Sequence, residues 1–158
     1  MLRPQTLADV AQRAREFPAE LYTALNEFAD EFYLDHPDKA AQQRRIDAIP
    51  EPVGEPLIDA LIGAVGEHLA QRWGLLVPDW TQRPVHFALE EPRFLPDSRA
   101  LRGALIVESP PAFRSRLLFT GAEPLDRARF PNVARARVPL DWPPPSDEPE
   151  PVAAPSRA

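Results

Sequence analysis

Proline recurs along the whole chain and limits the length of any regular element. Of the 158 residues, 21 are proline. Proline lacks a backbone N–H and fixes φ, so it interrupts the interior of a helix or strand but fits the first turn of a helix. We therefore expect short helices that begin at prolines or end before them, with little room for an extended sheet.

Hydrophobic spacing predicts helices throughout the first half of the chain. Thr6, followed three residues later by Asp9, is typical of a helix N-cap. A second helix is expected to begin at Pro18, with one apolar face formed by Leu21, Leu25, Phe28 and Phe32. A polar helix over 37–49 follows, and a stiff proline-rich linker near 50–56 ends this part of the chain.

The segment Pro56–Trp73 has the strongest helical pattern, with apolar residues that step by four: Leu57, Leu61, Val65, Leu69 and Trp73. Gly63 and Gly66 lie inside it, and each costs a helix roughly 1 kcal/mol relative to alanine. Because glycine is tolerated where another backbone approaches closely, we expect a tight helix crossing at these positions. Gly74 is predicted to end the helix.

The pattern is less regular after Gly74. Residues 85–89 alternate weakly and indicate a short β-strand. A helix is expected over 98–109, with Leu101, Leu105 and Ile106 facing inward, and Pro111 is expected to open a short further helix. Overall, we predict a mainly α fold: a single small helical domain over 1–130, irregular in its proline-rich C-terminal half and with at most a short β-strand pair.

Residues 131–158 are predicted to form a proline-rich, acidic and disordered tail. Leu140 and Trp142 are its largest apolar residues after Val138. Two interpretations of the tail remain open. It is either an inert extension or a carrier of a short linear motif that docks on a partner.

The net charge, the cysteine count and the length of the apolar runs exclude several classes of function. The net charge of −6 argues against a general surface for nucleic acid, since phosphate contacts need concentrated positive charge. The chain has no cysteine, which excludes disulfides, thiolate metal sites and a cysteine nucleophile. No apolar run is long enough to cross a membrane. We therefore expect a cytoplasmic protein without a membrane anchor.

Motifs for catalysis, metals and cofactors are missing from the sequence. Ser109 precedes two prolines and is interpreted as a helix-end residue rather than a nucleophile. The histidines lack a ligand partner at helical spacing, and the six glycines form no phosphate-binding loop. We therefore predict no catalytic, cofactor or metal site. An enzyme remains one alternative, with a site assembled from His86, Glu90, Glu91 and Arg93.

Arginines and phenylalanines alternate near the end of the predicted domain. The arginines are Arg114, Arg116, Arg127, Arg129, Arg135 and Arg137, and the nearby rings are Phe113, Phe119 and Phe130. Such residues bind acidic protein surfaces or nucleic acid, and they also pair with acidic residues of the same chain. All three interpretations remain open. A nucleic-acid-binding regulator that uses residues 113–137 is accordingly the second alternative function.

Two segments carry a resemblance to a known domain. They are Trp-Gly-Leu-Leu-Val-Pro-Asp-Trp-Thr at 73–81 and Glu-Ser-Pro-Pro-Ala-Phe-Arg-Ser-Arg-Leu-Leu-Phe-Thr-Gly at 108–121. The pair resembles a domain of bacterial antitoxin-like proteins, which often lies C-terminal to a helix-turn-helix module and is encoded beside a nucleotidyltransferase-like toxin. The resemblance covers residues 56–129 loosely. It departs from that group at residues 1–50, which lack the Gln-x-x-x-Ala turn of a helix-turn-helix module.

The sequence therefore predicts a non-enzymatic protein-binding module, similar to an antitoxin or accessory subunit of a two-gene bacterial system. The resemblance implies a protein partner, with a nucleotidyltransferase-like toxin as the candidate. The residues expected to act as structural anchors or to bind the partner are Trp73, Trp80, Phe113, Arg114, Arg116 and Phe119.

Overall fold

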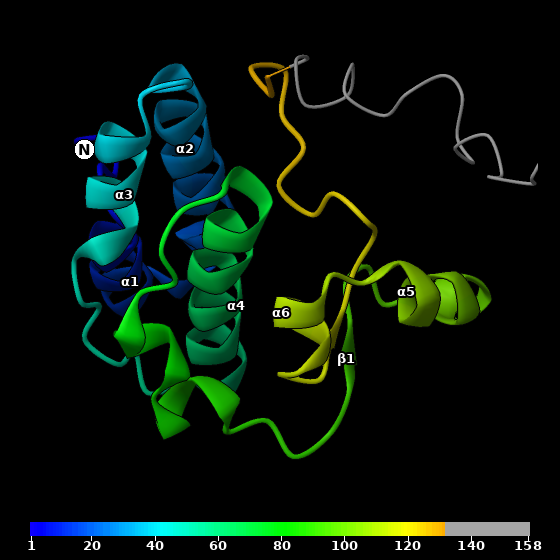
Figure 1. Ribbon diagram of the computed structural model, residues 1–158. Helices are drawn as coiled ribbons and strands as arrows, with labels where there is room; N and C mark the ends of the chain where they lie inside the picture. The colour runs from blue at the N-terminus through cyan, green and yellow to red at the C-terminus, as the bar shows by residue number, and fades with distance from the viewer. Residues whose placement is uncertain (132–158) are drawn as a thin grey trace, which may run out of the picture.

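The structure, a computed structural model, describes residues 1–131 and is mainly helical (Figure 1). The α-helices are α1 (Leu7–Glu16), α2 (Leu21–Leu34), α3 (Lys39–Asp47), α4 (Pro56–Trp73), α5 (Arg102–Glu108) and α6 (Pro111–Arg114). The short 3-10 helices are η1 (Pro18–Glu20), η2 (Asp79–Gln82), η3 (Pro84–Phe87) and η4 (Arg99–Leu101). Two strands, β1 (Arg93–Phe94) and β2 (Leu118–Phe119), form a small parallel pair. The predicted tail lies outside the described residues from position 132 onward.

Local sequence signals explain the first two helices. Thr6 accepts a hydrogen bond from the Asp9 backbone N–H, and the Asp9 carboxylate accepts one from the Thr6 N–H, which completes a capping box. Pro18 opens the 3-10 turn η1 that leads into α2. The four apolar residues predicted for one face of α2 are all buried, which confirms the helical spacing: Leu21, Leu25, Phe28 and Phe32.

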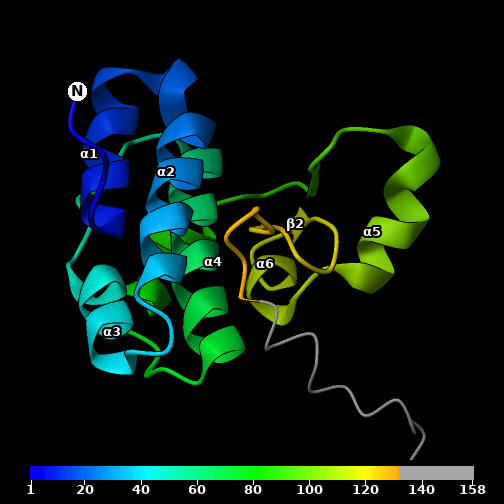
Figure 2. The ribbon, with the colours of Figure 1, turned by 90° about the horizontal axis from the view of Figure 1, so that it is seen from above.

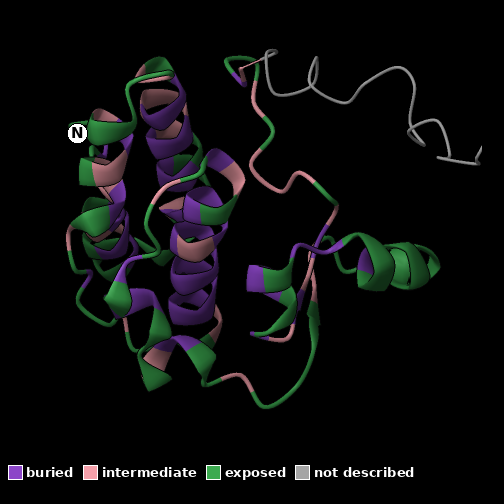
Figure 3. Cartoon of the chain, in the orientation of Figure 1, coloured by how far each residue is buried: buried purple, intermediate pink, exposed green. Residues whose placement is uncertain are grey.

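Helix α4 lies at the centre of the molecule and is buried on most of its circumference (Figure 3). It contacts α1 and α3 on one side, and η2, η3 and α6 on the others. Its boundaries confirm the sequence prediction, because it begins at Pro56 and is capped at its C-terminus by Gly74 in the left-handed conformation, with φ of 67°. Helices α1 and α2 pack against each other in the same core.

The glycines of α4 admit close neighbours, but these are not another helix crossing as the sequence suggested. A Cβ atom at Gly63 would lie 2.6 Å from the Cβ of His86, and one at Gly66 would lie 2.8 Å from the Trp80 ring. His86 and Trp80 come from the 3-10 turns η3 and η2. The glycines therefore make room for large side chains of the connector that follows α4.

The second half of the chain departs from the prediction in two places. Residues 85–89 were expected to form a strand, but Pro84 opens the 3-10 helix η3, whose His86 ring is drawn inward against Gly63. The strand pair forms elsewhere, where Arg93 aligns with Leu118 and Phe94 with Phe119. The expected helix over 98–109 does form, as η4 followed by α5.

The orientation of α5 is the second difference. Leu105 is buried as expected, but Leu101 and Ile106 are exposed rather than inward. In both ribbon views α5 stands apart from the layer formed by α1, α2, α3 and α4 (Figures 1 and 2). Its main contacts are with the turn η4 before it and with strand β2. Within residues 1–131, α5 packs by one face only, so its other apolar residues stay exposed.

Candidate interaction site

Helix α5 and the turn before it present apolar side chains to solvent. Leu101, Ile106 and Val107 are all exposed, and the side chain of Val107 is the most open of them, at 77%. The backbone of α5 is nevertheless well anchored at its C-terminal end. The Ser109 hydroxyl donates to the Leu105 carbonyl at 2.7 Å and accepts from the Thr120 N–H at 2.7 Å. This confirms Ser109 as a helix-end residue and holds α5 in its projecting position.

Positive charge surrounds this apolar surface. Residues 92–121 contain five arginines and two acidic residues, although the whole chain carries a net charge of −6. Arg102 lies over the Phe94 ring, with 4.9 Å from the guanidinium carbon to the ring centroid, and its only acidic contact within residues 1–131 is Asp97 at 3.4 Å. Arg114 is exposed and donates to the Ser109 carbonyl at 3.0 Å. The projecting segment is therefore both apolar and basic.

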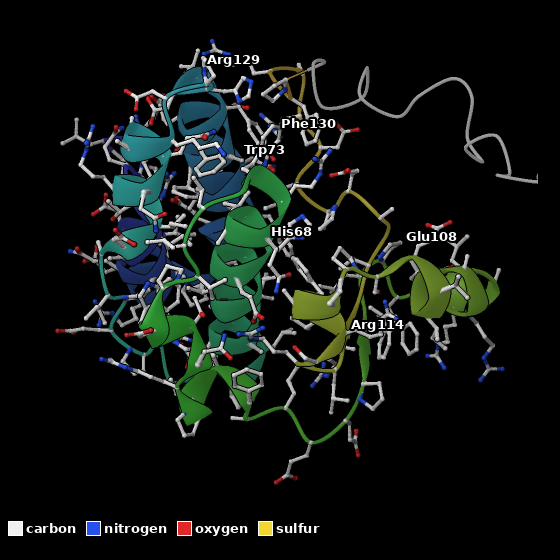
Figure 4. All side chains as sticks on the ribbon, in the orientation of Figure 1. His68, Trp73, Glu108, Arg114, Arg129 and Phe130 are labelled. Atoms are coloured by element: carbon white, nitrogen blue, oxygen red, sulfur yellow. The ribbon has the colours of Figure 1, made fainter. Side chains whose placement is uncertain are left out.

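A groove of about 440 Å³ separates α4 from the C-terminal end of α5. Its α4 wall is made by His68, Gln71 and Arg72, and the facing wall runs from Val107 to Arg114, with Ala122 beside it. Figure 4 shows His68 on α4, with Glu108 and Arg114 on the segment opposite. We refer to this feature as the His68 groove.

The His68 side chain is nearly enclosed, with only 6% of the residue exposed, yet it makes no hydrogen bond within residues 1–131. Its ring packs edge-on against Phe113, with centroids 5.6 Å apart. Burial lowers the pKa of His68 to about 4, and the charge of Arg72 acts in the same direction. His68 is therefore neutral at physiological pH and offers one ring N–H donor and one ring nitrogen acceptor to the groove.

Arg116 lies in the interior, where its side chain is 0% exposed. Its guanidinium donates to the Glu67 carboxylate at 2.5 Å, to the Ala112 carbonyl at 2.7 Å and to the Thr81 carbonyl at 2.7 Å. The Phe87 ring covers it, at 4.2 Å from the guanidinium carbon. Desolvation lowers the pKa of Arg116, whereas the Glu67 carboxylate raises it. Arg116 thus joins α4, η2, η3 and α6 from one position.

The backbone next to Arg116 is strained. Leu117 has φ of 60°, a left-handed conformation that costs a non-glycine residue roughly 1–2 kcal/mol. This residue turns the chain from α6 into β2, directly after Arg116. The contacts of the Arg116 guanidinium help to hold this turn.

The six predicted site residues fall into two groups. Trp73, Trp80, Phe113 and Arg116 are buried, and their side chains are enclosed by other residues of this chain. The remaining two are Arg114, which is exposed, and Phe119, which is half-buried and stacks on Phe94. In the described conformation the first group is therefore structural, and a partner has access to Arg114 and to part of Phe119.

The arginine run is divided in the same way. Arg116 pairs with Glu67, and Arg127 donates two hydrogen bonds to the Asp30 carboxylate, at 3.0 and 2.9 Å. Arg114 and Arg129 are exposed, whereas Arg135 and Arg137 lie outside the described residues. Two of the four described arginines are therefore committed to internal ion pairs.

The residues considered for an enzyme site do not assemble into one. Glu90 and Glu91 are both exposed on the connector before β1, and Arg93 is exposed as well. His86 is buried against α4, with its Nδ1 atom 2.7 Å from the Asp59 carbonyl oxygen. The His86 ring and the two carboxylates therefore share no cleft.

Sequence reasoning missed the exposure of α5, although the sequence contains a signal for it. Leu105, Ile106 and Val107 are consecutive, and consecutive residues of a helix point in different directions. A short helix packed by one face cannot bury all three. The groove beside it was missed because His68 and Arg114 are 46 positions apart and no local pattern links them.

Comparison of the chain with protein-family models, curated proteins and solved structures finds no match. Among the described residues, no helix is both long enough and apolar enough to cross a membrane. Within the same residues, the histidine and carboxylate side chains form no group of three suited to holding a metal ion.

Proposed function

We propose that this protein is a non-enzymatic binding module that docks on another protein through α5. The observation that carries the proposal is the exposure of Leu101, Ile106 and Val107 on an anchored helix that stands away from the core. Single exposed apolar residues are normal on a protein surface, whereas a group of them on one projecting element marks an interaction site.

The chemistry of the site specifies the kind of partner. A short helix with an apolar face fits a hydrophobic groove on a partner, which is a recurring mode of recognition. Arg99, Arg102 and Arg114 surround the apolar residues and are all exposed. Arginine forms bidentate hydrogen bonds with carboxylates, so the partner surface is expected to carry acidic residues around an apolar groove.

The narrower proposal is an antitoxin-like or accessory subunit of a two-gene bacterial system, with a nucleotidyltransferase-like toxin as the partner. It is supported by the resemblance of segments 73–81 and 108–121. Residues of both segments pack against α4, where Trp80 and Arg116 are buried, so the resemblance concerns the scaffold that holds α5. The partner surface itself is proposed from the exposure of α5.

The test is affinity capture from the native host with the tagged full chain and a variant pair. Val107→Glu removes an exposed apolar contact and adds a charge that repels acidic residues. Leu76→Glu is the matched control, because Leu76 is exposed to the same degree, at 78%, but lies on the connector after α4. We expect one stoichiometric protein with the wild-type chain and with Leu76→Glu, and its loss with Val107→Glu. Equal capture by all three chains, or by none, would count against α5 as the site.

A further inference from the structure

A second hollow of the molecule, with a volume of about 360 Å³, lies between α2, α4 and the segment that follows β2. It shares no lining residue with the His68 groove, and we refer to it as the Val65 pocket. Four of its lining residues belong to the buried core, and none of them is more than 5% exposed: Leu25, Leu61, Val65 and Phe113. Because core packing fixes these side chains, this apolar wall exists before any ligand binds.

The volume of the Val65 pocket limits the size of its occupant. An apolar cavity of about 150 Å³ holds one benzene molecule, and typical ligand pockets begin at about 300 Å³. The 360 Å³ of this pocket therefore suits a small molecule with about two fused rings.

The charges at the pocket favour an uncharged occupant. Among the described residues that line it, Glu123 is the one charged side chain. Arg72, which lies outside the pocket, donates to the Glu123 carboxylate at 3.1 Å. An uncharged molecule leaves this ion pair intact. An anion would instead lie beside a carboxylate without a basic partner, and an unpaired charge is costly to remove from water.

Two polar side chains of the pocket are available to a ligand. Tyr22 and Asn26 lie one turn apart on α2, and both are exposed and line the pocket. Neither side chain makes a hydrogen bond within residues 1–131. A ring compound could therefore bury its apolar surface against Leu61 and Val65 and form a hydrogen bond with Asn26 or Tyr22.

We propose that the Val65 pocket binds a small, uncharged ring compound that carries a hydrogen-bonding group. The proposal does not depend on α5 as a protein-binding surface. The pocket nevertheless lies at the base of α5, because Leu95 and Pro96 line it before η4, and Thr120 and Gly121 line it after α6. An occupant would therefore contact both chain segments that carry α5.

Indole, which has two fused rings and one N–H group, is the probe for a direct test. In NMR spectra of the methyl-labelled full chain, we expect indole to shift the signals of Leu61, Val65 and Leu125 in a saturable manner, with a Kd of about 1 mM or tighter. The signal of Ile46 in α3, which does not line the pocket, should not move. The proposal is overturned if the pocket signals show no saturable shift, or if Ile46 shifts as much as they do.

A matched pair of variants tests the location of the bound probe. Asn26→Trp places a large ring at the pocket and should weaken indole binding at least about tenfold. Thr23→Trp is the control, because Thr23 is also exposed on α2 but does not line the pocket. Thermal unfolding checks that both variants are folded. Indole binding that is equally strong in the two variants, or equally weak, would contradict the assigned site.

A matched pair of ligands tests the charge preference. Indole-5-carboxamide and indole-5-carboxylate have nearly the same shape, but only the carboxylate is charged at pH 7. We expect the carboxamide to bind at least about tenfold more tightly, because the anion lacks a basic partner in the pocket. Equal or tighter binding of the carboxylate would overturn the assignment of an uncharged ligand.

Discussion

The Arg116 guanidinium donates a 2.5 Å hydrogen bond to the Glu67 carboxylate, and this buried contact joins α6 to the central helix α4. The two residues are 49 positions apart in the sequence. Arg114, two residues before Arg116, is exposed instead. The same short run of sequence thus supplies one arginine that holds the scaffold and one that faces solvent beside the proposed binding surface.

Replacement of Arg116 should therefore destabilise the protein strongly. Arg116→Ala removes the guanidinium that donates to the Glu67 carboxylate and to the carbonyls of Ala112 and Thr81, and it leaves the buried Thr81 carbonyl without this donor. Breaking a buried ion pair by removing one partner costs about 3–5 kcal/mol, and we expect a loss of this size in the free energy of unfolding from urea denaturation. Arg114→Ala is the control and should change it by less than about 0.5 kcal/mol. Equal losses for the two variants would show that the assignment of their roles is wrong.

Alanine substitution at two helical glycines should have opposite effects. A Cβ atom at Gly63 would meet the Cβ and Cγ atoms of His86 at 2.6 and 2.8 Å, whereas one at Gly103 in α5 meets nothing within 4 Å. Alanine improves helix propensity by roughly 1 kcal/mol, but overpacking a core costs about 1–3 kcal/mol. Thermal unfolding should show a lower Tm for Gly63→Ala and an unchanged or higher Tm for Gly103→Ala. A higher Tm for Gly63→Ala would disprove the close approach of His86.

Stability should fall as the pH decreases through the titration range of His68. Its pKa is about 4 in the folded protein and 6.5 as the ordinary value, so between these values the unfolded chain binds a proton that the folded one does not. The free energy of unfolding should thus be highest above about pH 6.5 and lower by about 3 kcal/mol near pH 4. Burial also lowers the pKa of His86, which adds a change in the same direction.

The variant His68→Gln separates the two histidines, because glutamine has no charge to gain in this range. Urea denaturation at a series of pH values should show a smaller loss of stability for His68→Gln than for the wild-type chain. The remaining loss is assigned to His86. If both chains lose the same free energy of unfolding between about pH 6.5 and pH 4, His68 is not buried as described.

The sequence predicted the elements that local rules determine. The boundaries of α4 follow from Pro56 and Gly74, and the capping box follows from the spacing of Thr6 and Asp9. Local patterns also placed Ser109 at a helix end. Each of these features depends on residues within one turn of the chain, which is why single-sequence reasoning recovers them.

Features that depend on contacts distant in sequence were missed. The segment 85–89 alternates like a strand, yet Pro84 starts a 3-10 turn whose His86 fits against Gly63. Arg116 has the same charge as Arg114 and a similar local sequence. Only the position of Glu67, which accepts a hydrogen bond from Arg116, distinguishes the roles of the two arginines. Ile106 was expected inward because the sequence alone does not show that α5 projects away from the core.

The central claim is that α5 binds another protein through its exposed apolar residues, and one titration tests it most directly. The protein captured from the host is purified and titrated, by isothermal calorimetry, against wild-type chain and against chain carrying Ile106→Glu and Val107→Glu. We predict a Kd at least about tenfold weaker for the double variant, which corresponds to about 1.4 kcal/mol, with unchanged thermal unfolding. An unchanged Kd with an intact fold would contradict the account and place the binding surface elsewhere on the molecule.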